Sequence, residues 1–167
     1  NFKSSWINTL DESMSFWSNR FTCPGNMFVP RKPWPFGNEY HSTCCGISGI
    51  MFAVELVEGK DSPKEIKPNF NEMGKTVGLL LRLTRSIWNE GKIVILDSGF
   101  CVLKGIIELR KKGVFGAALI KKRRYWPKFV KGDDNIKQFE DKEIGYSDSL
   151  PGKMDGVSFD IFAMKEP

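Results

Sequence analysis

Hydrophobic and polar residues follow strand-like patterns through the first third of the chain. Residues 5–16, SWINTLDESMSF, place apolar side chains around Asp11 and predict a strand with a carboxylate near its middle. Residues 21–40 contain four prolines and two glycines, which favour tight turns between short strands. Residues 38–59 are rich in small and β-branched side chains and end in alternation, so they predict two paired strands.

The pattern changes to helical spacing after the polar loop at residues 60–70. Residues 73–91 repeat apolar side chains at helical spacing and end at Gly91, a typical helix stop, so they predict a helix. KIVILD, residues 92–97, is a continuous apolar run, typical of a strand covered on both faces. A second helix is predicted at residues 101–113 and a short buried strand at 114–121. This order predicts an α/β domain with crossover connections.

The last part of the chain is less regular. Residues 133–156 are polar and rich in turn-forming residues, and residues 157–167 alternate briefly, like an edge strand. With 167 residues, 41% of them hydrophobic and 27% charged, the chain fits one globular domain. It contains no apolar run of about 18 residues, so no membrane span is expected. There is no signal-peptide pattern, and because the sequence begins with Asn, an upstream part is expected.

The chain has four cysteines and one histidine, so few nitrogen and sulfur ligands are available for a metal ion. His41, Cys44 and Cys45 could form part of a zinc site, but their spacing matches no common ligand pattern and no C-x-x-C pair occurs. Reduced, mostly buried thiols in an intracellular protein are the favoured interpretation.

Positive charge is concentrated in one segment. Ten Lys or Arg residues and one acid, Glu108, lie in the segment from Lys104 to Lys131. This segment therefore carries a charge of +9 and the rest of the chain −4, which gives the total of +5. The excess predicts a basic face for a polyanion. Two alternatives stay open for KKRR at residues 121–124: a nuclear-import signal, or a solvated loop. The candidate DNA-binding residues are Lys121, Lys122, Arg123, Arg124, Tyr125, Trp126, Lys128 and Lys131, with the two aromatic rings available for base stacking.

Two aspartates are candidate site residues. Asp97 ends a predicted buried strand, and sites of α/β sheets gather at the carboxyl ends of strands. Its alternative role is an N-cap for the following helix, which Ser98 could perform equally well. Asp11 lies in a strand-like stretch where a carboxylate is out of pattern, and its alternative role is that of a solvent-facing residue. Glu12 would point to the opposite face, so only one of these two neighbours can face Asp97.

Two carboxylates brought together repel each other unless a cation neutralises them. Mg²⁺ binds carboxylate oxygens together with water and phosphate, and such ions can activate a water or a 3′-OH on a phosphodiester. The sequence therefore permits a nuclease-like site beside a basic face, without requiring one.

Several segments resemble the catalytic core of piggyBac-type transposases, in the same order along the chain. WINTLDESMSFWSNR (6–20) and MFVPRKPWPFGNEY (27–40) resemble its first catalytic strand and the basic, proline-containing segment that follows. ILDSGFCVL (95–103) resembles its second catalytic strand. LKGIIELRKKGVFGAALIKKRRYWPK (103–128) resembles a transposable element-derived subgroup of the family.

The resemblance implies an RNase H-like mixed sheet flanked by helices, incomplete at the C-terminal end. It divides the chain into a core at residues 1–131 and the start of an insertion or edge-strand region at residues 132–167. It also implies a DDE/D mechanism of metal-dependent DNA strand cleavage and transfer, in which Asp11 and Asp97 are the first two catalytic, metal-binding carboxylates with Mg²⁺ or Mn²⁺ as cofactor. The implied partners are transposon ends and target DNA, with a homodimer as a further option, and the implied location is the nucleus.

The family's third aspartate lies further on, in a segment with no counterpart here, so this 167-residue chain is expected to be inactive alone. The family's upstream DNA-binding parts and cysteine-rich C-terminal domain are also not found in this sequence. Two alternatives stay open: a domesticated or decayed element product that binds DNA without catalysis, and a plain α/β domain whose aspartates are caps or surface residues.

Overall fold

A computed structural model describes residues 2–19, 21–23, 25–57, 70–121 and 137–167. Its first half is built from strands: β1 (Ile7–Phe16), the short β2 (Met27–Phe28), β3 (Phe36–Cys45) and β4 (Met51–Val57). The turn between β3 and β4 reverses the chain at Gly49, which has φ +69° and whose N–H donates to the carbonyl of Cys45 (2.8 Å). The predicted strands in residues 5–16 and 38–59 are therefore confirmed.

Helices and strands alternate in the second half, as the sequence predicts. The elements are the 3-10 turn η1 (Asn71–Met73), α1 (Lys75–Leu83), η2 (Arg85–Ile87), β5 (Ile93–Leu96), η3 (Ser98–Phe100), α2 (Leu103–Lys111) and β6 (Phe115–Ala118). The helix predicted at residues 73–91 is shorter than expected. Gly74, with φ +99°, precedes its first residue, and a separate 3-10 turn follows after Thr84.

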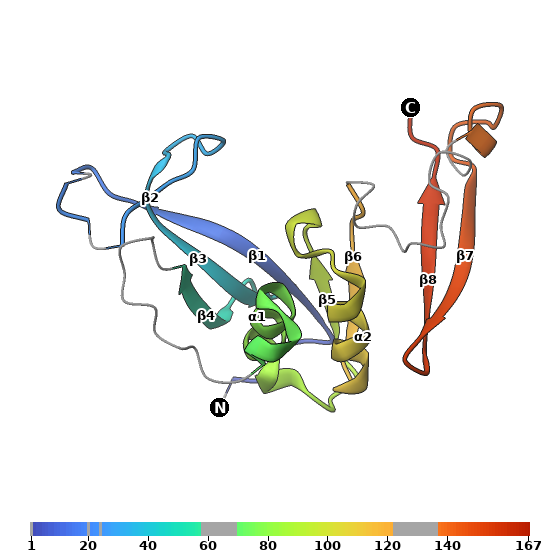
Figure 1. Cartoon of the computed structure of the whole chain (residues 1–167), viewed down its shortest axis with the longest axis horizontal. Coiled ribbons are helices and arrows are strands. Elements are labelled where there is room, and N and C mark those ends of the chain that lie inside the picture. Colours follow the sequence, from blue (N-terminus) through green and yellow to red (C-terminus); the bar gives the residue numbers. More distant parts are fainter. Residues whose placement is uncertain (1, 20, 24, 58–69, 122–136) are drawn as a thin grey trace.

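These strands form one six-stranded mixed sheet in the order β2-β3-β1-β5-β6, with β4 also paired to β3 (Figure 1). The pairs of β3 with β1, β2 and β4 are antiparallel, whereas β1–β5 and β5–β6 are parallel. The sheet is therefore mixed, and its parallel half is the part that needs helical crossovers.

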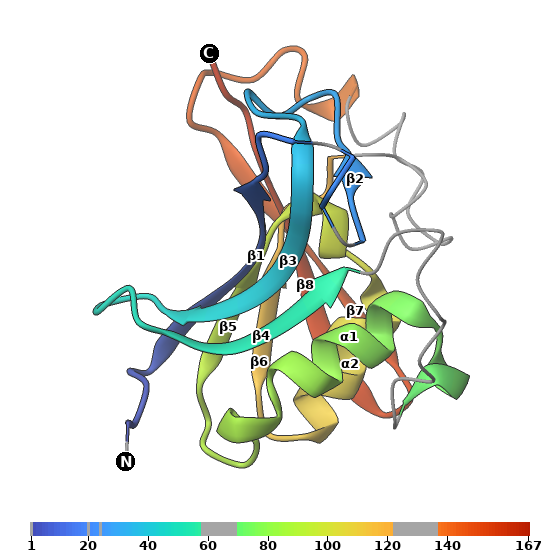
Figure 2. The same cartoon turned by 90° about the vertical axis from the view of Figure 1, so that its left-hand side faces the viewer.

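Both helices cover the same face of the sheet (Figures 1 and 2). α1 supplies five of the twelve core side chains because its apolar residues run almost without interruption from Val77 to Leu83. They pack against Leu10 of β1 and against Val94 and Leu96 of β5, each 2% exposed or less. The core members are Leu10, Val77, Leu79, Leu80, Leu81, Leu83, Ile87, Val94, Leu96, Phe100, Leu109 and Val114.

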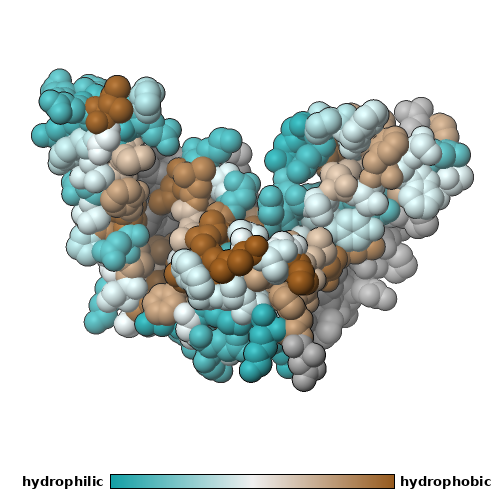
Figure 3. Space-filling model, turned by 180° about the vertical axis from the view of Figure 1, so that it is seen from behind, coloured by the Kyte–Doolittle hydropathy of each residue, from teal (hydrophilic) through white to brown (hydrophobic). Residues whose placement is uncertain are grey.

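The opposite face of the sheet is open, which corrects two predictions. Ile95 of β5 is 40% exposed and Phe115 of β6 is 44% exposed, so neither KIVILD nor residues 114–121 form a strand buried on both faces. Figure 3 shows apolar side chains gathered in the hollow of the face turned away from the helices. Because both helices pack on one side, the outward-pointing half of each strand stays uncovered within the described residues.

A separate antiparallel hairpin closes the described chain. Strand β8 (Val157–Met164) confirms the alternation at residues 157–167, and it pairs with β7 (Ser147–Met154), which lies in a segment predicted to be turn-rich. The hairpin contacts α2 where Lys111 Nζ lies 3.3 Å from Asp155 Oδ2. None of the helices in the described part has the length and apolar character needed to span a bilayer.

Candidate active site

Asp11 and Asp97 come from two neighbouring parallel strands. The register of β1 with β5 pairs Ile7 with Ile93 and ends with Leu10 paired to Leu96. Asp11 and Asp97 are the next residues on the two strands. Adjacent strands lie about 4.8 Å apart, and registered residues point to the same face. The register therefore brings together the two aspartates that the sequence singles out.

Both aspartates point to the open face of the sheet. Leu10 and Leu96, one position earlier, are buried against the helices at 1% and 2% exposure. Because side chains alternate along a strand, the aspartates that follow them turn to the other side. Asp97 keeps an extended backbone, with φ −66° and ψ 163°, so this alternation continues past the end of β5. Both side chains are exposed, which leaves their carboxylate oxygens accessible to a ligand.

The environment of Asp97 favours its ionised form. It stands at the N-cap position of η3 but makes no capping hydrogen bond through its side chain. The backbone N–H of Ser98 is the main influence that lowers the pKa of Asp97, and the charge of Lys121 adds a smaller contribution in the same direction. Val102, not Asp97, stands at the N-cap position of α2, and the N–H groups of Ser98 and Gly99 act on the exposed Asp97 carboxylate.

Asp11 lies in the middle of β1, opposite Ser42 of β3. Its Oδ1 accepts a hydrogen bond from the backbone N–H of Glu12 at 2.7 Å. This bond is local and engages one of the two carboxylate oxygens. The side chain is exposed, as the alternative interpretation of a solvent-facing residue expects, so exposure alone does not decide its role.

Lys121 is the one candidate DNA-binding residue that lies within the described part of the chain. It follows β6, the third of the parallel strands, and its charge acts on Asp97. A positive charge therefore lies at the carboxyl ends of the parallel strands, where the two carboxylates also lie. The other candidate DNA-binding residues, Lys122, Arg123, Arg124, Tyr125, Trp126, Lys128 and Lys131, lie outside the described residues.

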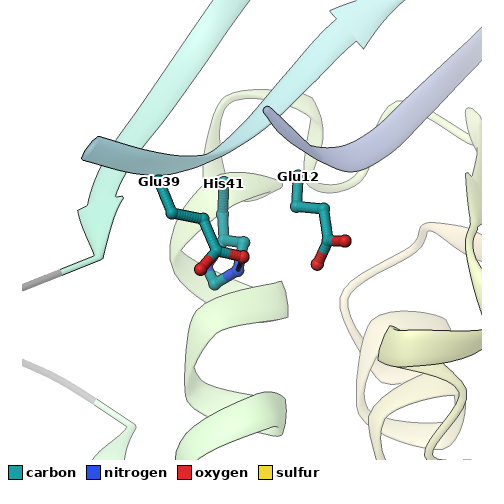
Figure 4. Close-up of side chains that lie close together, drawn as sticks. All are labelled: Glu12, Glu39 and His41. Atoms are coloured by element: carbon teal, nitrogen blue, oxygen red, sulfur yellow. Dashed lines mark ion pairs between the residues drawn. The ribbon is translucent and has the colours of Figure 1, made fainter. Parts of the chain in front are cut away.

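A second polar cluster lies on the helix-covered face. Glu12 of β1 and Glu39 and His41 of β3 place their potential ligand atoms within 4.8 Å of one another (Figure 4). It is the one group of three among the described residues that could hold a metal ion by this criterion. No sequence pattern reveals this group, because it depends on the register of β1 with β3, in which Glu12 lies opposite His41.

Cations already pair with Glu12 in this second cluster. Glu12 pairs with Arg31, and Lys32 Nζ lies 3.7 Å from Glu12 Oε1. His41 Nε2 lies 4.0 Å from Glu39 Oε1, and its ring packs edge-on against Phe100 with ring centroids 5.2 Å apart. We interpret the cluster as an ion-pair network that supports the turn after Asp97. The metal-like group contains His41 without Cys44 or Cys45, so the described geometry does not assemble the zinc alternative.

A small cavity joins this network to the start of α1. Its volume is about 240 Å³, and its lining includes Glu12, His41, Lys75 and Gly99. Gly99 and Phe100 belong to the turn that follows Asp97, so the network and the cavity lie directly behind the candidate site.

Comparison with known proteins gives two matches. A family model described as Transposase IS4 matches residues 1–155. The chain is also similar to a cryo-EM structure of the piggyBac transposase synaptic complex with hairpin DNA, with a TM-score of 0.64 and 17% sequence identity. That match covers 89% of this chain and 29% of the transposase chain. Comparison with curated proteins finds no relative. The RNase H-like fold that the family resemblance implies is thereby confirmed.

Proposed function

Because this chain belongs to the Transposase IS4 family, we propose that its sheet carries two catalytic carboxylates of an enzyme that cleaves and transfers DNA strands. The chain is a piece of a transposase catalytic core by family and fold. The observation that supports the proposed roles of Asp11 and Asp97 is the β1–β5 register, which makes them neighbours on the open face. Since the chain spans 29% of the transposase structure that it matches, the activity of the whole protein remains our proposal.

Transposases of the DDE type depend on a divalent metal ion, and the donor set here fits one. Asp11 and Asp97 offer exposed carboxylate oxygens, the hard ligands that Mg²⁺ and Mn²⁺ prefer. When bound, the metal would lower the pKa of an attacking water or 3′-OH and stabilise the leaving oxygen. The low pKa of Asp97 suits this role, because its carboxylate is ready to bind a cation without first losing a proton.

The residues around the carboxylates would position the DNA. Lys121, beside Asp97, would hold a phosphate near the reacting bond. The basic run from Lys122 to Lys131 would continue along the DNA backbone. We propose transposon ends and target DNA as the partners of the full-length protein, a homodimer as its working form and the nucleus as its location. The piggyBac match is itself a structure with hairpin DNA, which supports DNA as the partner class.

Asp97→Asn in the full-length protein is expected to abolish metal-dependent DNA cleavage. The amide removes the negative charge and one metal ligand while keeping the size of the side chain. Because Asp97 is exposed and lies outside the core, the melting temperature should stay nearly unchanged. Cleavage of labelled transposon-end DNA with Mg²⁺ or Mn²⁺, measured beside thermal unfolding, checks both expectations.

Asp148→Asn is the matched control. Asp148 is also an exposed strand aspartate, and its Oδ1 accepts the N–H of Ser149 at 2.8 Å, as Oδ1 of Asp11 accepts that of Glu12. It lies in the separate hairpin, so its loss should leave cleavage intact. Cleavage that persists in Asp97→Asn would show the assignment to be wrong. Salt-dependent DNA binding without any cleavage by the wild-type protein would favour the non-catalytic alternative instead.

A further inference from the structure

The loops at the β2 end of the sheet expose an unusual number of aromatic rings. We name these side chains the aromatic cluster, and they lie where β1 ends and where β2 and β3 begin (Figures 1 and 2). Its members, with their exposed fractions, are Phe16 (50%), Trp17 (42%), Phe21 (84%), Phe28 (58%) and Trp34 (65%). Gathered apolar side chains exposed to this extent mark binding surfaces.

The rings of the aromatic cluster are held in place by one another and by the loop. The ring centroids of Phe16 and Trp34 lie 5.1 Å apart, and those of Phe28 and Phe36 lie 4.8 Å apart. The indole N–H of Trp17 donates to the hydroxyl of Thr22 at 3.3 Å, which fixes the orientation of that ring. Rings fixed before binding lose little conformational entropy when a flat ligand stacks on them.

A cavity lies among these rings. Its volume is about 320 Å³, at the lower end of the range for small-ligand sites. Ser18 and Asn19 add polar groups to its lining, beside the rings of Phe16, Trp17, Phe21 and Phe36. Asn19 shapes the loop, because its side-chain oxygen accepts the N–H of Phe21 at 3.1 Å and its carbonyl accepts the N–H of Thr22 at 3.2 Å. The site offers stacking faces and a few hydrogen-bonding groups, which suits a nucleobase.

The charge around the aromatic cluster favours a polyanion. Residues 16–37 contain three Arg or Lys residues and no Asp or Glu. The side chain of Arg31 remains 62% exposed although it pairs with Glu12. A single DNA strand combines phosphates with flat bases, so it complements both the charge and the rings.

The kind of exposed side chain fits base stacking. Every large hydrophobic side chain that is exposed among the described residues from 16 to 36 is aromatic. The open face of the sheet differs, because aliphatic side chains such as Val54, Leu56 and Ile95 are exposed there. Base stacking needs rings alone, and the aromatic cluster supplies them.

We propose that the aromatic cluster binds unpaired DNA bases by stacking. The inference rests on the proposed function, since it adds a second contact to the DNA that the carboxylates would cut. Phe16 lies five residues beyond Asp11 on the same strand, about 17 Å away at the usual rise.

Leucine substitutions separate stacking from simple burial. Phe21→Leu and Trp34→Leu in the full-length protein keep an apolar side chain but remove the ring. Each should weaken binding of a single-stranded oligonucleotide about tenfold, the size expected for one lost base–aromatic stack. Fluorescence anisotropy over a range of salt concentrations measures this change. The slope of log K against log salt should stay unchanged, because stacking releases no counterions.

Three controls sharpen the test. Trp6→Leu removes a tryptophan that is 61% exposed but lies at the other end of β1, so it should leave affinity unchanged. Phe21→Tyr keeps the ring and should keep affinity near the wild-type value. Binding of fully paired duplex DNA should change little in the leucine variants, since its bases are already stacked on one another.

Two results would overturn the inference. One is wild-type affinity for single-stranded DNA in both leucine variants. The other is a change of oligomeric state or domain association in these variants without a change in DNA affinity, which would assign the aromatic cluster to a protein contact. Either result can be told apart from failure of the proposed function, because Asp97→Asn is judged by cleavage and these variants are judged by binding.

Discussion

Asp97 remains ionised at the end of β5 because its neighbours stabilise the negative charge. The N–H of Ser98 lowers its pKa most, and Lys121 brings a positive charge from the end of the next strand. The sequence alone could identify Asp97 and Asp11 as candidates, since each interrupts an apolar or strand-like pattern. It could not decide between cap and catalyst for Asp97. The register places Asp97 beside Asp11 on the open face, and its catalytic role is our proposal.

Glu12 and His41 show what sequence reasoning cannot supply at this scale. The alternation of β1 predicts that Glu12 points away from Asp11, and this is confirmed by its place beside α1. Its neighbours Glu39 and Arg31 come from other segments, whose positions depend on the register of β3 and on the loop before it. No local pattern encodes that register, so the ion-pair network could not be predicted.

Cys45 gives a residue-level prediction. Hydrogen bonding, chiefly from the Ser48 hydroxyl and then from Ser5, lowers the pKa of the Cys45 thiol to about 6. Its thiolate should therefore predominate at pH 7 and be lost as the pH falls below about 6. Ser48→Ala should raise this pKa and slow alkylation of Cys45 at pH 7 several-fold. Mass spectrometry after brief iodoacetamide treatment across pH 5–9 resolves each cysteine.

Cys101 is the internal control for how accessible a buried thiol is to iodoacetamide. It is 4% exposed, close to the 3% of Cys45, but burial raises the pKa of its thiol. Cys101 should therefore react appreciably only at alkaline pH. Equal pH profiles for the two cysteines would contradict the hydrogen-bond account of Cys45.

The individual elements were predictable where a periodic pattern was long. Helices within residues 73–91 and 101–113, and strands around Asp11 and before Asp97, all occur. Strand β7 was missed because Ser147–Met154 contains Pro and Gly and lacks alternation, so its pairing with β8 decides its conformation. The two-sided burial expected for β5 and β6 is wrong because both helices pack on one face. A run of apolar residues does not reveal which face receives a helix.

Gly105 tests the packing of α2 against α1. A Cβ at this position would lie 2.6 Å from Cδ1 of Leu80, which is fully buried. Gly105→Ala should destabilise the fold by about 1 kcal/mol, because overpacking costs roughly 1–3 kcal/mol and the helix propensity of Ala offsets up to about 1 kcal/mol. Urea unfolding measures the change.

In a Leu80→Ala background, Gly105→Ala is expected to have the opposite effect on the free energy of unfolding. Removing the Leu80 side chain costs about 2–5 kcal/mol by itself, but it opens space for the new methyl group. Gly105→Ala should then stabilise the protein through better helix propensity and partial filling of the cavity. Destabilisation by Gly105→Ala of similar size in both backgrounds would argue against the contact.

At the scale of the whole molecule, a mixed sheet brings together residues that lie 86 positions apart in the sequence. β5 joins β1 in parallel only after the chain has formed the β3–β4 hairpin and crossed over through α1. The sequence could predict the α/β class, and its resemblance to a known family could predict the RNase H-like order. The β1–β5 register itself, on which the candidate site depends, needed the structure.

Direct measurement of metal binding tests the central claim, that Asp11 and Asp97 form one site. Mn²⁺ binding to the full-length protein can be followed by electron paramagnetic resonance in Asp11→Asn, Asp97→Asn, the double variant and Asp148→Asn. Each single variant should bind Mn²⁺ at least tenfold more weakly, the double variant should lose little more, and Asp148→Asn should match the wild type. Losses that simply add, or wild-type affinity in either single variant, would contradict a shared site.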